Sequence, residues 1–167
     1  PLGVRLFGTR DNNHWQYNVA WLRKMEKDTN SGLNDLGKPW RKDDSFVINV
    51  YRQDLPSLGH TSQFTLLHNV NREGSQIYFN NNGVLERPAV LGDSRPRNYH
   101  VTYLGYNGDG HFGRWNLTTS AYLAFGRDER HPLAQKPQNI RAGFAAAELS
   151  RDFSWTRVRA TAMVASG

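Results

Sequence analysis

The chain has 167 residues, a suitable length for one domain, and its 21 Lys and Arg residues against 15 Asp and Glu residues give a formal net charge of +6. The absence of cysteine excludes disulfide bonds and thiolate metal sites. No run of about 18 apolar residues occurs, which excludes a transmembrane helix within these residues.

Alternation of apolar and polar residues with a period of two dominates the sequence, whereas helical periodicity is scarce. In chain order, this alternation predicts eight strands: Gly3–Arg10, His14–Lys27, Asp44–Asp54, His60–Arg72, Arg97–Asn107, Phe112–Gly126, Gln138–Ser150 and Phe153–Ser166. Most are longer than the usual strand of about five or six residues. Tilted strands of roughly 9–11 residues are long enough to cross a bilayer.

The connections between these strands alternate between short and long. TRDNNH, DLPSLGH, NGDGHFG and SRDF are short, and the three segments between them are long. Outer-membrane barrels have this order, because their short turns face the periplasm and their long loops face outside. Within NGDGHFG, the residues NGDG are predicted to form the tight turn, since Asn and Gly tolerate positive φ. The predicted fold is therefore all-β: an antiparallel up-and-down transmembrane β-barrel or part of one, with residues 1–167 as a single barrel domain that we expect to be a segment of a larger barrel.

The two faces of the predicted strands differ in polarity. Trp15, Tyr17, Val19 and Trp21 alternate with Gln16, Asn18, Ala20 and Leu22, and Phe46, Ile48 and Val50 share a face in the next strand. In the hairpin over 98–126, we expect Val101, Tyr103, Leu117 and Leu123 to meet lipid, and Thr102, Asn116, Thr118 and Ser120 to meet an aqueous lumen. Because aromatic residues near strand ends are typical of membrane interfaces, a lipid-facing girdle is predicted at Trp15, Trp21, Tyr99, Trp115, Phe125 and Trp155.

Basic residues fall on the wetter parity of several strands. The predicted pore-lining residues are Arg5, Lys24, Arg114, Arg141, Arg157 and Arg159. Rings of Arg and Lys favour anions in pores. The sequence leaves open the alternative that these cations pair with Asp and Glu or only solvate the wall. Arg23 falls on the apolar parity, where a long side chain can reach the interface.

Motifs for other chemistry are missing from the sequence. The six histidines lack metal-ligand spacing, and the Asp- and Asn-rich stretches lack the EF-hand pattern. No GxSxG motif, P-loop or cysteine nucleophile occurs. We therefore predict no enzymatic activity, no metal and no cofactor. The basic residues are dispersed without a recognition motif, so no nucleic-acid partner is expected.

Four segments, WQYNVAWLRKMEKDTNSGLND, VYRQDLPSLGHTSQF, YLGYNGDGHFGRWNLTTSAYLAFG and AAELSRDFSW, carry a resemblance to known proteins. They resemble parts of large bacterial outer-membrane β-barrels of the alginate-export-like, porin-type class. The resemblance implies a location in the bacterial outer membrane, contact with its lipid and lipopolysaccharide, and a parent barrel with more than eight strands.

The expected function is a porin-like channel for passive passage of polar or anionic small solutes, with acidic saccharides among the candidates. Two alternatives remain open from the sequence. One is a barrel that sheathes a protein partner, such as an electron-transfer cytochrome, in or beside its lumen. The other is a soluble, secreted β-sandwich that binds glycans, in which exposed tryptophans would stack on sugars.

Overall fold

A computed structural model describes the chain except for residues 29–30, 32, 39, 76–77, 80–84 and 87–96. The described residues contain strands and loops but no helix. The main strands are β1 (Leu2–Arg10), β2 (Trp15–Arg23), β3 (Asp43–Gln53), β4 (His60–Arg72), β7 (Asn98–Phe112), β8 (Trp115–Asp128), β9 (Gln138–Asp152) and β10 (Arg157–Ser166). Two further strands of two residues each, β5 (Tyr78–Phe79) and β6 (Leu85–Glu86), pair with each other.

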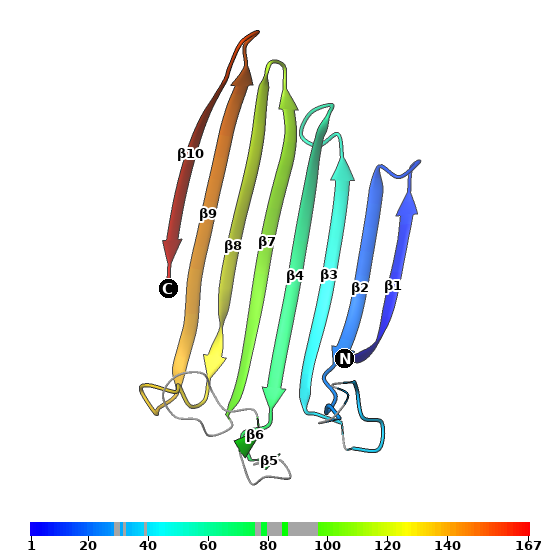
Figure 1. Cartoon of the computed structure of the whole chain (residues 1–167), viewed down its shortest axis with the longest axis vertical. Coiled ribbons are helices and arrows are strands. Elements are labelled where there is room, and N and C mark those ends of the chain that lie inside the picture. Colours follow the sequence, from blue (N-terminus) through cyan, green and yellow to red (C-terminus); the bar gives the residue numbers. More distant parts are fainter. Residues whose placement is uncertain (29–30, 32, 39, 76–77, 80–84, 87–96) are drawn as a thin grey trace.

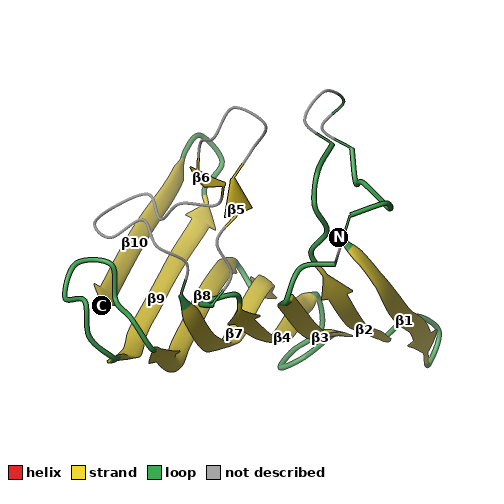
Figure 2. Ribbon diagram, turned by 90° about the horizontal axis from the view of Figure 1, so that it is seen from below, coloured by secondary structure: helices red, strands yellow, loops and turns green. Residues whose placement is uncertain are grey.

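The eight main strands form one antiparallel sheet in the order β1-β2-β3-β4-β7-β8-β9-β10, so each main strand pairs with the next one along the chain (Figure 1). This confirms the predicted all-β meander. The sheet is open, with β1 and β10 at its edges, and it forms a curved layer (Figure 2). An open sheet is compatible with part of a barrel, because closure requires both edges to find partners.

The connections follow the predicted alternation. Short turns join β1 to β2, β3 to β4, β7 to β8 and β9 to β10, and all four lie at one end of the sheet (Figure 1). The long segments leave from the opposite end. We call these the turn end and the loop end. The separation follows from the antiparallel order, because alternate connections of a meander lie at opposite ends.

The turn between β7 and β8 differs from the prediction. Asn107, Gly108, Asp109 and Gly110 belong to β7 and pair with β8, and the chain reverses at Gly113 and Arg114. Gly113 has a φ of 63°, the left-handed conformation that glycine adopts most readily. Gly110 is required for another reason: a Cβ at this position would lie 2.3 Å from the carbonyl oxygen of Gly59. The glycines of NGDG therefore allow close packing instead of forming the turn.

Directly opposed residues point to the same side of a sheet, so the register carries each face across all eight strands. One face, here called the apolar face, includes Leu2, Val4, Leu6, Trp15, Tyr17, Val19, Trp21, Phe46, Ile48, Val50, Phe64, Leu66, Leu104, Leu117, Leu123, Phe125, Leu149, Val158 and Val164. The other, called the polar face, includes Gln16, Asn18, Ser45, Asn49, Gln63, Thr65, Asn107, Asn116, Thr118, Ser120 and Thr161.

The expected sidedness of β7 is wrong. Tyr103 is opposed to Ala124 and lies on the polar face with Val101, whereas Thr102 is opposed to Phe125 and lies on the apolar face. The two parities of β7 both carry large side chains, so alternation alone did not determine which one continued the apolar face of its neighbours. Only the register with β4 and β8 fixed it.

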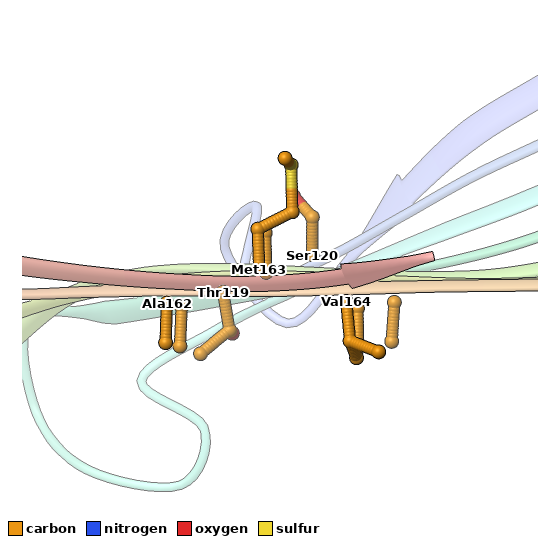
Figure 3. Close-up of a pocket in the computed structure, with 9 residues that line it drawn as sticks. Thr119, Ser120, Ala162, Met163 and Val164 are labelled. Carbon is orange, nitrogen blue, oxygen red and sulfur yellow. The ribbon is translucent and has the colours of Figure 1, made fainter. Parts of the chain in front are cut away.

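Figure 3 shows how thin the layer is near β10. Met163 and Ser120 point to one side of the sheet, and Ala162, Thr119 and Val164 point to the other. Among the described residues, Met25 and Val101 are the only buried apolar side chains. The sheet therefore lacks the dry core that a layered soluble domain builds between its elements.

Candidate lipid-facing and channel-lining faces

The apolar face is exposed along its whole width. Val4 is 70 % exposed in β1, Phe64 is 48 % exposed in β4 and Val164 is 67 % exposed in β10. No described helix or strand packs extensively against this face. Soluble monomers rarely expose contiguous apolar patches larger than a few hundred Å². A face of this kind requires an apolar environment or a covering partner.

Several uncharged polar groups on the apolar face bond to one another or to the backbone. His68 Nδ1 lies 2.8 Å from the hydroxyl of Thr102, and the hydroxyls of Ser62 and Tyr106 are 3.1 Å apart. Ser62 also donates to the carbonyl oxygen of Leu55 at 2.8 Å. In hydrocarbon, polar groups must find partners inside the protein because water is absent. These pairings meet that requirement.

Charged side chains lie at the ends of the strands on the apolar face. Within the eight main strands, this face carries seven arginines and one carboxylate: Arg10, Arg23, Arg52, Arg72, Arg127, Arg141, Arg151 and Asp44. Three of the arginines lie over tryptophan rings near a strand end. The distances from guanidinium carbon to ring centroid are 4.8 Å for Arg52 on Trp15, 5.3 Å for Arg151 on Trp115 and 5.4 Å for Arg23 on Trp21. Paired Trp and Arg side chains suit the headgroup level of a membrane.

The apolar stretch has the length that a bilayer requires. The ten residue steps from Trp115 to Phe125 in β8 span about 33 Å at about 3.3 Å per residue. At the tilt of about 40° that is usual in outer-membrane barrels, this length covers about 25 Å along the membrane normal. That height equals the apolar band of such barrels.

The one carboxylate that the main strands place on the apolar face, Asp44, forms a triad with Arg23 and Arg72 at the loop end. The Asp44 side chain is only 2 % exposed. It accepts hydrogen bonds from Arg23 Nε at 2.7 Å, Arg23 Nη2 at 2.8 Å and Arg72 Nη2 at 3.0 Å. The indole nitrogen of Trp21 donates a fourth bond at 3.0 Å. The carboxylate thus holds two guanidiniums and one indole from two flanking strands in fixed positions.

The polar face carries a network of neutral and acidic groups across β7 and β8. Asn107 donates to the Tyr122 hydroxyl at 2.6 Å and accepts from Ser120 at 2.9 Å. Thr118 donates to Asp109 at 2.6 Å. Beside this network lies a shallow depression of about 250 Å³, lined by Tyr51, Thr61, Gln63, Asn107, Gly108, Asp109, Thr118, Thr119 and Ser120. Hydroxyl, amide and carboxylate groups of this kind suit contact with water and polar solutes.

A second network of hydrogen-bonded polar side chains lies at the loop end of the polar face. Asp43 is buried and accepts from Lys24 Nζ at 2.5 Å, Asn69 at 2.8 Å and Asn71 at 3.2 Å. Arg41 donates to Glu73 at 2.7 Å in the adjoining loops. These bonds tie the long loops to the ends of β3 and β4.

The predicted pore-lining cations do not gather in one place. Arg5 lies on the polar face of β1, at one sheet edge, and donates to Asn18 from Nε at 2.9 Å. Lys24 pairs with Asp43 at the loop end. Arg157 and Arg159 lie on the polar face of β10, at the opposite edge.

Two of the predicted cations lie elsewhere. Arg141 lies on the apolar face, because it is directly opposed to Phe125, and Arg114 lies in the turn between β7 and β8. On the polar face, Arg159 pairs with Glu148 at 3.2 Å, and Arg157 donates to Asp152 at 2.9 Å. Three of the six predicted cations, Lys24, Arg157 and Arg159, therefore pair with carboxylates, as in the alternative that the sequence left open.

Four residues of the predicted girdle, Trp15, Trp21, Trp115 and Phe125, lie on the apolar face. Tyr99 instead lies on the polar face, where it is opposed to Asn71 and Asp128. Trp155 lies in the turn between β9 and β10 and is 87 % exposed. Parity within a single strand could not place Tyr99, for the same reason that it misplaced Val101 and Tyr103.

Sequence reasoning missed the concentration of arginines at the strand ends of the apolar face. The available signal was parity: Arg52 is two residues from Val50, and Arg127 is two residues from Phe125. The pairing of Asp44 with both Arg23 and Arg72 left no such signal, because the three residues are far apart in the sequence and meet only through the register of β2, β3 and β4.

No group of three or more His, Asp or Glu side chains arranged for a metal ion occurs within the part of the chain that the structure describes. The same part contains no helix that is long and apolar enough to cross a membrane. Comparison of the chain with family models, with curated proteins and with solved structures found no match.

Proposed function

We propose that this sheet is part of the wall of a porin-like channel in the bacterial outer membrane, with the apolar face toward lipid and the polar face toward an aqueous lumen. One observation carries the proposal: the apolar face is uncovered across all eight strands, and charge appears on it only at the strand ends. A sheet between two solvents needs this arrangement, because side chains of successive residues meet opposite sides. In this orientation the turn end faces the periplasm and the loop end faces outside.

The proposed solutes are small polar molecules that cross passively. Within the eight strands, the polar face carries five carboxylates, Asp43, Asp109, Asp128, Glu148 and Asp152, against three arginines, Arg5, Arg157 and Arg159. Two of those arginines are ion-paired. A wall with this balance provides little net positive field, so it supports passage of neutral polar solutes better than selective passage of anions.

Cysteine labelling tests the orientation directly, because the natural chain has no cysteine. Adjacent residues in one strand provide matched pairs: Ile48→Cys with Asn49→Cys in β3, and Leu123→Cys with Tyr122→Cys in β8. In the full protein in its membrane, a charged, membrane-impermeant maleimide should label the Asn49 and Tyr122 positions at least about tenfold faster, because hydrocarbon excludes a charged reagent. Equal labelling within both pairs would refute the membrane orientation.

Transport is a separate measurement. Purified protein reconstituted into liposomes should make them swell in solutions of small neutral sugars or amino acids, at a rate that depends on solute size. If the protein is labelled on one face only but gives no swelling, the proposed membrane orientation stands and the open channel is rejected.

A further inference from the structure

We propose that the Arg23–Asp44–Arg72 triad binds the phosphate headgroup of an anionic membrane lipid at the loop end of the apolar face. This inference rests on the proposed membrane orientation and specifies one lipid contact within it. The triad is formed by side chains of β2, β3 and β4 that the register brings together.

The triad retains net positive charge and donors for a ligand. Two guanidiniums share one carboxylate, so the group has a formal charge of +1. Arg23 uses its Nε and one terminal nitrogen on Asp44, and Arg72 uses one terminal nitrogen. A guanidinium has five N–H donors, so both side chains can also bond to a further anion. The Arg23 side chain is 29 % exposed and the Arg72 side chain is 62 % exposed, so a further anion can reach both.

The carboxylate also makes the site rigid. Asp44 is almost fully buried and receives four hydrogen bonds, one of them from Trp21. Long side chains normally lose conformational freedom when they bind an anion, and a partner that already fixes them lowers that cost. Guanidiniums held in this way suit the bidentate bonds that phosphate oxygens accept.

The position of the triad identifies the anion as a lipid headgroup. On the strands that bear it, the apolar face continues from the triad through Trp21 and Phe46 toward the middle of the sheet. A lipid can place its phosphate on the triad and its acyl chains on this adjoining surface, whereas a dissolved anion gains nothing from the apolar residues. Exposed Arg127 and Arg141 lie near the same end of β8 and β9, which are separated from β4 by β7, so the apolar face carries further positive charge at the loop end.

Quenching of tryptophan fluorescence by brominated lipids tests this inference. The full protein is reconstituted in phosphatidylcholine bilayers with a minor fraction of phosphatidylglycerol, and either lipid carries the bromine. For the native protein, the binding constant for phosphatidylglycerol obtained from the quenching should exceed that for phosphatidylcholine by about fivefold. This is the effect expected of one basic side chain near a membrane surface. Arg23→Gln with Arg72→Gln should remove the preference. The matched control, Lys27→Gln with Lys136→Gln, removes two exposed loop charges instead and should retain the preference.

The outcomes separate this inference from the proposed function. No quenching by brominated phosphatidylcholine would show that the protein is outside the bilayer, which rejects the membrane proposal itself. Quenching without a preference, or an equal loss of preference in the lysine control, would reject only the triad as a lipid site. Arg72→Gln alone retains the Arg23–Asp44 pair. It should lower the preference without loss of insertion, so the test does not depend on the double variant being stable.

Discussion

On the apolar face, the charged side chains of the main strands lie within four residues of a strand end, whereas the polar face also carries a charge further inside a strand. Ala121 and Leu123 lie in the middle of β8 on the apolar face, far from any charge on their own strand and face. On the polar face, Glu148 lies well inside β9 and pairs with Arg159. The two faces are built from the same backbone and differ only in residue parity. The difference therefore comes from residue parity, and it is the difference that the proposed membrane orientation requires.

The largest expected effect comes from a charge placed in the middle of the apolar face. Ala121→Arg should lower the free energy of unfolding in a bilayer by about 2–4 kcal/mol, the cost of an arginine at the membrane midplane. Ser120→Arg, one residue away on the polar face, should cost about 1 kcal/mol through the lost bond to Asn107. Denaturant unfolding in lipid vesicles measures both. Equal costs would mean that the two faces meet the same solvent.

A smaller effect is expected from removal of the one carboxylate on the apolar face. Asp44→Asn leaves two guanidiniums without a counter-charge and should destabilise the protein by about 2 kcal/mol, less than for a fully buried pair because the arginines are partly exposed. Asp152→Asn, which breaks the exposed pair with Arg157 on the polar face, should leave the unfolding midpoint unchanged. A larger loss of unfolding free energy in the Asp152 variant than in the Asp44 variant would contradict the prediction that the Asp44 pairs contribute more to stability.

The arginines over tryptophan rings should contribute less. Arg52→Gln removes a guanidinium that lies 4.8 Å from the centroid of Trp15, and the expected loss is about 0.5–1 kcal/mol. The tryptophan emission should also shift, because the charge over the ring is removed. Arg114→Gln, in an exposed turn, serves as the control and should change neither quantity.

The smallest effect concerns ion selectivity. Because Arg157 and Arg159 are paired with Asp152 and Glu148, the native channel should show only weak selectivity in a salt gradient. Arg157→Gln with Arg159→Gln leaves those carboxylates without partners and should move the reversal potential toward cation selectivity, by a permeability ratio on the order of twofold. A strongly anion-selective native channel would instead favour the wider anionic substrate range that the sequence suggested.

The sequence by itself determined the fold class. The period-two alternation predicted all eight main strands, because a strand that separates two environments must alternate. The alternation of short and long connections predicted which strands form tight hairpins. Trp15, Trp21 and Trp115 were assigned to the apolar face from parity alone, since their strands alternate clearly.

Only the tertiary structure decided what depends on register. The faces of β7 were fixed by its pairing with β4 and β8, and the same pairing placed Tyr99 on the polar face and the NGDG glycines inside a strand. The triad of Arg23, Asp44 and Arg72 exists only because three strands align at one level. Alternation is a property of one strand and is visible in the sequence, whereas register depends on how the side-chain patterns of neighbouring strands and the turns between them match, so no single strand shows it.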